Sequence, residues 1–176
     1  MKGTILVAIC LFIFGFKSFA SGLDEDGPLE FDVPEAFEVK FWPYEKPRYT
    51  ITWPDSKTWF GFGYWGSKAE IPEERFEGML KRIPETILSY ATREGLDADE
   101  VSAFPNAEEL EFEPIDGEVI SGTFIRLDHS TEREAGQVQA FFFFHDGEDV
   151  WQGDFAGHQD ALDQAVEILA KIKRKD

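Results

Sequence analysis

The first third of the chain alternates short runs of aromatic and β-branched residues with turn-forming residues. The runs span Phe37–Trp42, Tyr49–Trp53 and Thr58–Trp65. The second and third runs flank Pro54-Asp55-Ser56-Lys57, and proline with aspartate between two such runs is typical of a turn. The pattern therefore predicts three strands, of which the last two form a hairpin.

A helical periodicity follows these strands. Pro72 suits a first helical turn, and Gly95 supplies a C-terminal stop. Pro84 removes one backbone hydrogen bond in between, but the apolar stripe keeps its phase across it, so we expect one long, kinked helix. The stripe recurs at spacings of three and four residues and consists of Phe76, Leu80, Ile83, Ile87 and Tyr90.

The second half of the chain returns to strand patterns and closes with a helix. Asp146-Gly147 is a two-residue hairpin signal between the last two strands. The final helix is expected from Gln159 to Arg174, with acidic residues at its start and basic residues at its end, as the helix dipole favours. The predicted strands are Leu110–Glu113, Val119–Asp128, Gln137–Phe144 and Asp149–Phe155. The predicted buried stripe of the helix is Leu162, Ala165, Val166, Leu169 and Ile172.

Four consecutive phenylalanines, Phe141–Phe144, carry the most information about the core. Successive side chains of a strand point to opposite faces, so two rings lie on each side of the sheet. A solvated face does not tolerate such rings, so this strand should be central and covered on both sides. Because two helices are available, we predict an α+β fold, an antiparallel β-sheet with helices packed on both faces in an α/β/α sandwich.

This order of elements resembles the PsbP-like α/β/α sandwich superfamily, which includes extrinsic photosystem subunits, a Ran-binding nuclear factor and bacterial effector chaperones. The likeness is strongest in Gln137–Arg174, where an aromatic strand, a turn, a second strand and a closing helix follow one another. It is a likeness of element order, without a diagnostic motif. The resemblance implies a protein-binding, non-enzymatic domain.

The N-terminus carries the pattern of a secretory signal peptide. A short basic segment precedes the apolar stretch Ile5–Phe16, and Ser18-Phe19-Ala20 places small residues at the end of a cleavage site. A membrane-spanning helix needs about 20 apolar residues, whereas Lys17 interrupts this run earlier. We therefore predict cleavage between Ala20 and Ser21 and a periplasmic or secreted mature chain without membrane insertion.

Composition divides the rest of the chain into two parts. Residues 21–30 are rich in glycine and acidic residues and predict a flexible leader, whereas residues 31–176 form a single α+β domain. The only cysteine, Cys10, lies in the predicted signal peptide (residues 1–20). The mature chain therefore has no thiol for a disulfide, a zinc–thiolate site or a nucleophile.

Charge narrows the possible partners. The chain has 17 basic and 35 acidic residues, and loss of Lys2 and Lys17 with the signal peptide leaves 15 against 35, a net charge of −20. Such a chain repels nucleic acids and anionic lipid headgroups. Cations, neutral glycans and proteins with basic surfaces stay as candidate partners, and the alternative is that the charge serves only solubility.

One segment imitates a cofactor motif. Gly61-Phe62-Gly63-Tyr64-Trp65-Gly66 matches the dinucleotide fingerprint G-x-G-x-x-G. That motif needs a helix that begins at once, so that backbone amides meet the phosphates. Here the helix signals begin only near Pro72, so we expect no cofactor.

The same segment supplies the candidate ligand-binding residues, Trp59, Trp65 and Tyr64. On a strand, Trp59 and Trp65 share one face with Gly61 and Gly63, whereas Tyr64 points to the other face. Two indoles that flank glycines can stack on a sugar ring or on a partner's side chain. The alternative is that the indoles pack in the core, with glycine admitting close backbone approach.

Titratable residues form no catalytic or metal-binding motif in the sequence. No pair of histidines has ligand spacing among His129, His145 and His158. Calcium prefers oxygen ligands, but no EF-hand spacing exists among the hairpin carboxylates Asp146, Glu148, Asp149 and Asp154. A Ser-His-Asp triad or a carboxylate pair is assembled in space, so the order of residues selects none. We therefore name no metal ligand and no catalytic residue.

Three functions are compatible with these observations. The leading hypothesis is a non-enzymatic binding or adaptor domain that contacts a protein partner, and a partner with a basic surface would suit the acidic chain. The second is a glycan-binding module that uses Trp59 and Trp65, which requires exposed indoles. The third is a hydrolase built from carboxylates or histidine, which requires a concave site.

Overall fold

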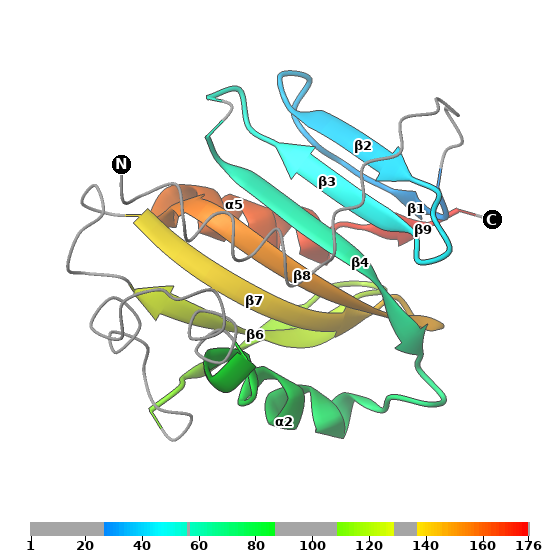
Figure 1. The fold of residues 1–176 in the computed structure, drawn as a ribbon. Helices are drawn as coiled ribbons and strands as arrows, with labels where there is room; N and C mark the ends of the chain where they lie inside the picture. Colours follow the sequence, from blue (N-terminus) through cyan, green and yellow to red (C-terminus); the bar gives the residue numbers. More distant parts are fainter. Residues whose placement is uncertain (1–26, 56, 87–108, 129–136, 176) are drawn as a thin grey trace.

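The computed structural model describes residues 27–55, 57–86, 109–128 and 137–175. Its main element is a seven-stranded antiparallel sheet in the order β2-β3-β4-β8-β7-β6-β5 (Figure 1). The predicted signal peptide with its cleavage site between Ala20 and Ser21 lies outside the described residues. No helix within the described ranges is long and apolar enough to cross a membrane.

The strands follow the predicted runs, with shifted ends. The Asp146-Gly147 turn forms as predicted: Gly147 has a φ of 97°, and the Asp146 N–H donates to the Asp149 carbonyl at 3.1 Å. The strand bounds are β1 (Leu29–Glu30), β2 (Glu38–Trp42), β3 (Arg48–Thr52), β4 (Trp59–Ser67), β5 (Phe112–Asp116), β6 (Ser121–Asp128), β7 (Gln137–His145), β8 (Asp149–His158) and β9 (Lys173–Arg174).

Strand β7 carries Phe141–Phe144 and lies between β8 and β6, inside the sheet. All four rings are buried, with exposed fractions of 2% or less. Phe142 and Phe144 belong to one hydrophobic cluster and Phe141 and Phe143 to a second one. The prediction of an inner strand covered on both sides is therefore confirmed. We call the face with Phe142 and Phe144 the first face and the opposite one the second face.

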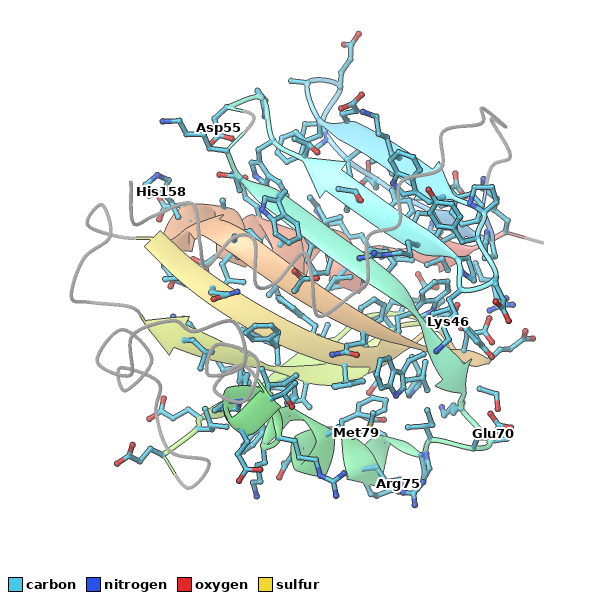
Figure 2. All side chains as sticks on the ribbon, viewed as in Figure 1. Lys46, Asp55, Glu70, Arg75, Met79 and His158 are labelled. Carbon is cyan, nitrogen blue, oxygen red and sulfur yellow. The ribbon has the colours of Figure 1, made fainter. Side chains whose placement is uncertain are left out.

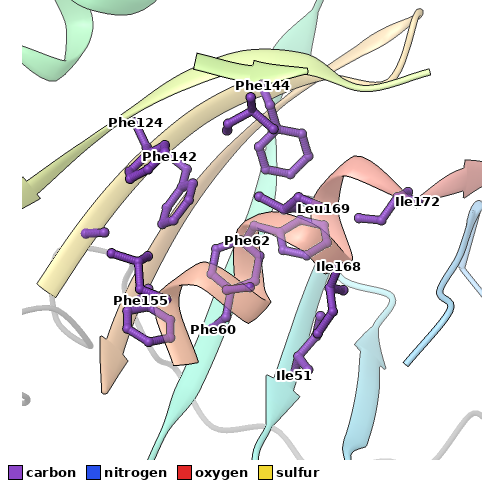
Figure 3. Close-up of a cluster of buried hydrophobic side chains, with 14 of the residues drawn as sticks. Ile51, Phe60, Phe62, Phe124, Phe142, Phe144, Phe155, Ile168, Leu169 and Ile172 are labelled. Atoms are coloured by element: carbon purple, nitrogen blue, oxygen red, sulfur yellow. The ribbon is translucent and has the colours of Figure 1, made fainter. Parts of the chain in front are cut away.

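The first face packs against helix α5 (Gln159–Ala170), which lies behind the sheet in Figure 1. Aromatic rings fill the interface, as Figure 3 shows: Phe60 and Phe142 are 5.0 Å apart between ring centroids, and Phe62 and Phe144 are 5.2 Å apart. Aromatic pairs at such separations add about 0.5–1.5 kcal/mol beyond the burial of their area. The first face is the main core of the protein.

The second face receives a much shorter helix. The 3₁₀ turn η1 (Glu73–Arg75) leads into α2 (Phe76–Leu80), which packs mainly against β6 and β7. The chain is helical again at residues 83–86. Pro84 has no N–H to donate to the Leu80 carbonyl, so it begins a new helical turn instead of continuing the first. The described residues therefore do not form the one long, kinked helix that the sequence predicts. The predicted stripe positions Ile87 and Tyr90 and the predicted stop Gly95 lie outside them.

The predicted α/β/α sandwich with helices packed on both faces is wrong. The described residues are mainly β: the seven-stranded sheet, a two-stranded sheet of β1 and β9, and short helical segments. The physical reason lies on the second face, where β3, β4 and β8 place polar side chains and glycines between Trp59 and Trp65. This part of the face lacks the continuous apolar surface against which the stripe of a helix could pack.

Helix α5 also ends earlier than the charge pattern indicates. It stops at Ala170 instead of Arg174, and Lys173–Arg174 form β9, which pairs antiparallel with β1. Leu29 of β1 is buried, and its N–H donates to the Tyr49 hydroxyl at 2.9 Å. The last residues of the segment for which the sequence predicts a flexible leader thus join the C-terminus to the domain.

Candidate ligand-binding face

The strand register divides the second face into two halves. Over β6 and β7, an apolar half presents side chains that pack under Phe76 and Leu80 of α2: Ile125, Leu127, Phe141 and Phe143. Over β3, β4 and β8, a polar half is built from two cross-strand rows. One row is Arg48, Gly63 and Gln152, and the next is Thr50, Gly61 and Asp154.

The two candidate tryptophans lie on this second face, at opposite ends of the two glycines. The Trp59 indole covers Gly61, because a Cβ placed there would be 3.3 Å from Trp59 Cζ3. Trp65 occupies a β-bulge between Tyr64 and Gly66, its ring meets Phe143 edge-on at 5.9 Å, and its side chain is 43% exposed. Trp59 is half-buried. We call Trp59, Gly61, Gly63 and Trp65 the tryptophan strip.

The third candidate, Tyr64, lies elsewhere. Its ring meets Trp151 at 6.1 Å, and Trp151 belongs to the core of the first face. The structure thus brings Trp59 and Trp65 to one surface and places Tyr64 on the other side of the sheet, in agreement with the alternation expected for a strand.

Arg48 of β3 lies between the two indoles. A Cβ at Gly63 would be 3.2 Å from Arg48 Cγ, so the arginine stem lies flat on the glycine backbone. Burial lowers the pKa of Arg48, and the charge of Asp154 acts against that lowering. The glycines therefore let an indole and an arginine lie against the strand where larger residues would hold them away.

Two buried polar side chains lie on the same face of the sheet, on the neighbouring strand β8. Gln152 and Asp154 of β8 are 4% and 2% exposed, and Gln152 Oε1 and Asp154 Oδ2 have no hydrogen-bond partner within the described part of the chain. Burial raises the pKa of Asp154 to about 8, against the opposing charge of Arg48. At neutral pH, Asp154 is therefore mainly a neutral carboxylic acid. Buried polar atoms without partners cost about 1–3 kcal/mol each, so this pair is a feature that requires an explanation.

Sequence reasoning missed Arg48, Gln152 and Asp154 as members of this surface. A signal was present in β8, where Gln152 and Asp154 interrupt a strand of apolar residues at alternate positions. Alternation places both on one face of an inner strand. Arg48 carries no such signal, because only the pairing of β3 with β4 brings it to Gly63.

Three of the four hairpin carboxylates that could attract calcium share another partner. Arg174 binds Asp146 at 2.9 Å, Glu148 at 2.9 Å and Asp149 at 3.1 Å. Asp146 also accepts a hydrogen bond from the Trp151 indole N–H at 3.0 Å. These groups fasten the C-terminal strand to the β7–β8 hairpin. Within the described ranges, no group of three or more histidine, cysteine or acidic side chains is placed to hold a metal ion.

One histidine lies in a hydrogen-bonded chain, which bears on the hydrolase hypothesis. Ser121 Oγ donates to Glu73 Oε1 at 2.7 Å, and Glu73 Oε2 lies 3.1 Å from His145 Nε2. The Gly147 N–H donates to His145 Nδ1 at 3.2 Å. The histidine thus contacts the glutamate and a backbone amide, and the serine hydroxyl donates its hydrogen bond to the glutamate. This arrangement ties η1 to the sheet and does not place the histidine against the serine as the base of a Ser-His pair.

The remaining motifs take structural positions. Gly61 and Gly66 of the fingerprint-like segment lie inside β4, with no helix opening at its first glycine, so the segment lacks the phosphate-binding geometry. His158 is exposed at the end of β8, and His129 lies outside the described residues.

No family model matches this chain, and no curated protein or solved structure matches it.

Proposed function

We propose that this protein is an exported, non-enzymatic binding domain that holds a glycan on the tryptophan strip. The observation that carries the proposal is the layer Trp59–Arg48–Trp65 along β4, in which the Trp59 indole and the Arg48 stem lie on glycine backbone and Trp65 follows at the bulge. Sugar rings bind proteins by stacking their apolar face on aromatic rings while hydroxyl groups find polar partners. The strip offers the aromatic rings, and Arg48 beside it offers a polar partner.

The two indoles differ in what they offer. Trp65 is one of the most exposed large apolar side chains among the described residues, at 43%, and its edge is fixed by Phe143. A side chain that is both exposed and held in place loses little conformational entropy when a ligand binds. Trp59 is more covered and provides a platform close to the sheet.

Fluorescence titration with soluble neutral, acidic and amino oligosaccharides tests this function. We expect saturable quenching of tryptophan emission by at least one of them, and at least about a tenfold loss of affinity in Trp65→Ala and in Trp59→Ala, which corresponds to about 1.4 kcal/mol. Trp42→Ala is the matched control, because this exposed tryptophan lies on the edge strand β2 outside the strip. Equal losses in all three variants, or no binding by the intact protein, would remove the proposal.

A protein partner is the second candidate function, and it has its own observation. Trp42 and Tyr44 are 39% and 43% exposed, and their rings stack with centroids 6.2 Å apart and an interplanar angle of 9°. Exposed aromatic residues of this kind are enriched at protein interfaces. A cross-linked pull-down from an envelope extract at low and moderate salt tests it. A dominant partner that is lost with Trp42→Ser and Tyr44→Ser, but kept with Trp65→Ala, would favour this function over the first.

A further inference from the structure

We infer that Gln152 and Asp154 select the ligand of the tryptophan strip by binding the hydroxyl groups of an uncharged sugar. This inference rests on the proposed glycan-binding function and names the class of glycan and the residues that recognise it. It starts from two buried oxygen atoms without partners, Gln152 Oε1 and Asp154 Oδ2, which lie on the same strand face as the strip.

The positions of these groups relate them directly to the strip. Gln152 is the cross-strand neighbour of Gly63, and Asp154 is the cross-strand neighbour of Gly61. Directly paired residues have Cα atoms about 4.5–5.5 Å apart, so both side chains lie at the level of the glycines between the indoles. A sugar that stacks on the strip therefore has its hydroxyl groups within reach of these side chains.

The hydrogen-bonding capacity of the pair fits hydroxyl groups. Gln152 Oε1 accepts a hydrogen bond and needs a donor, whereas a protonated Asp154 can donate through its O–H. A hydroxyl group both donates and accepts, so a sugar satisfies both atoms without a change in protonation. A ligand without matching hydroxyl groups would leave these buried polar atoms without hydrogen bonds, so the site discriminates strongly against such a ligand.

The charge of the surroundings favours an uncharged sugar over an ionised one. Among the described elements beside Asp154, β3 contributes Arg48, β4 contributes Gly61 and Trp59, and β7 contributes Phe141. Arg48 is the charged group in this set and disfavours a cationic amino sugar. An anionic uronic acid would be repelled by a chain of net charge −18 and by Asp154 whenever it ionises.

Access of a ligand to Asp154 requires movement of side chains, because this residue is buried. Asp154 is 2% exposed, and Trp59 and Arg48 lie over the neighbouring glycines. Glycine has no Cβ that would hold the indole or the arginine stem in place, so both side chains can move when a ligand enters. Recognition of the ligand and displacement of the two side chains are thus one event.

Titration of two matched variants tests the inference. Asp154→Asn keeps a donor and an acceptor in a group of the same shape, whereas Asp154→Leu removes both and fills the space. We expect neutral oligosaccharides to bind the wild-type protein at least tenfold more tightly than uronic-acid or amino-sugar oligomers of the same linkage. We expect Asp154→Asn to keep affinity within about threefold and Asp154→Leu to lose at least tenfold. Thermal unfolding of each variant verifies that it is folded.

The pH dependence supplies a second readout. Wild-type affinity should fall as pH rises through about 8, because the buried carboxyl group then loses the proton that it donates, whereas Asp154→Asn should show no such fall. Unchanged binding by Asp154→Leu, or equal binding of charged and neutral oligomers, overturns the inference. If binding is still weakened by Trp59→Ala and Trp65→Ala in that case, the proposed function stands. Absence of binding by every oligomer overturns both.

Discussion

The two halves of the second face have the same depth of burial and opposite chemistry. In the apolar half, Phe141 and Phe143 are 1% and 2% exposed; in the polar half, Gln152 and Asp154 are 4% and 2% exposed. Burial of a phenylalanine ring contributes about 1.5–3 kcal/mol to stability, whereas burial of a polar atom without a partner costs about 1–3 kcal/mol. The apolar half therefore stabilises the fold, whereas the polar half destabilises it. A binding site is expected in the polar half, because functional sites are where a fold departs from the most stable arrangement.

The sharpest test of the apolar half is Phe143→Ala. Phe143 packs against Phe76 of α2 and against Trp65, so its truncation leaves a cavity between the helix and the sheet. We expect a loss of about 3–5 kcal/mol in the free energy of unfolding, measured by urea denaturation. Phe112→Ala, at a half-buried position on the edge strand β5, should cost clearly less. A loss below about 1 kcal/mol in Phe143→Ala would show that α2 does not close this half.

The polar half should respond in the opposite direction. Asp154→Asn is expected to stabilise the protein above pH 8 by about 1–4 kcal/mol, because it removes an ionised carboxylate from the interior. The sign follows from the raised pKa of Asp154, about 8 instead of 3.8. Between these values the folded state binds a proton that the unfolded state has released, so wild-type stability falls as pH rises from about 4 to about 8.

Urea denaturation of both proteins from pH 4 to pH 9 measures this difference. Subtracting the Asp154→Asn curve from the wild-type curve cancels the contributions of all other titrating groups. The stabilities should converge near pH 4 and separate above it. Parallel curves over the whole range would mean that Asp154 is ionised in the folded state, and the contrast between the halves would lose its physical basis.

The contrast also explains how far the sequence alone predicts this molecule. Signals carried by consecutive residues were sufficient: Phe141–Phe144 predicted an inner strand with two covered sides, and Asp146-Gly147 predicted a tight hairpin. Both depend on local periodicity and turn chemistry, which do not change with the rest of the fold. The shared face of Trp59 and Trp65 followed from the same alternation.

The remaining features depend on distant pairing. Arg48, Gly63 and Gln152 form one row only because β8 inserts next to β4, far along the chain. The same polar row leaves no continuous apolar surface on which a second helical layer could pack. The polar residues that form the candidate site are therefore also the reason why the predicted α/β/α sandwich is wrong. The early end of α5 has a similar cause, since pairing of β9 with β1 outweighs the charge pattern that favours a longer helix.

A smaller effect is expected where η1 is fastened to the sheet beside the apolar half. Burial acts to raise the pKa of Glu73, but hydrogen bonds from Ser121 and His145 outweigh it and hold this pKa below its ordinary value. Glu73 is largely solvated, with its side chain 45% exposed, so Glu73→Gln should cost only about 0.5–1 kcal/mol at pH 7. The carboxylate contributes stability above its unfolded pKa, and this contribution disappears as pH falls through the folded value.

Thermal unfolding of Glu73→Gln at pH 7 and at pH 3 checks both the size and the sign. Glu74→Gln is the matched control, because Glu74 is exposed on the same turn. The difference between wild-type protein and Glu73→Gln should shrink at pH 3. A cost that persists unchanged at pH 3 would assign the effect to shape instead of charge.

The smallest effect concerns the boundary between the halves, where Lys46 lies beside the end of β4 (Figure 2). Lys46 Nζ lies 5.7 Å from the centre of the Trp65 ring, and an exposed cation–π contact contributes about 0.5–1 kcal/mol. Lys46→Ala should therefore lower stability by about 0.5 kcal/mol, against no change in Lys57→Ala on the distant turn between β3 and β4. The ammonium group covers the indole surface on which a sugar would stack, so removing Lys46 should leave glycan affinity unchanged or raise it. A tenfold loss of affinity in Lys46→Ala would instead indicate that the ligand contacts Lys46. Trp65 would then have only a packing role, against the apolar half.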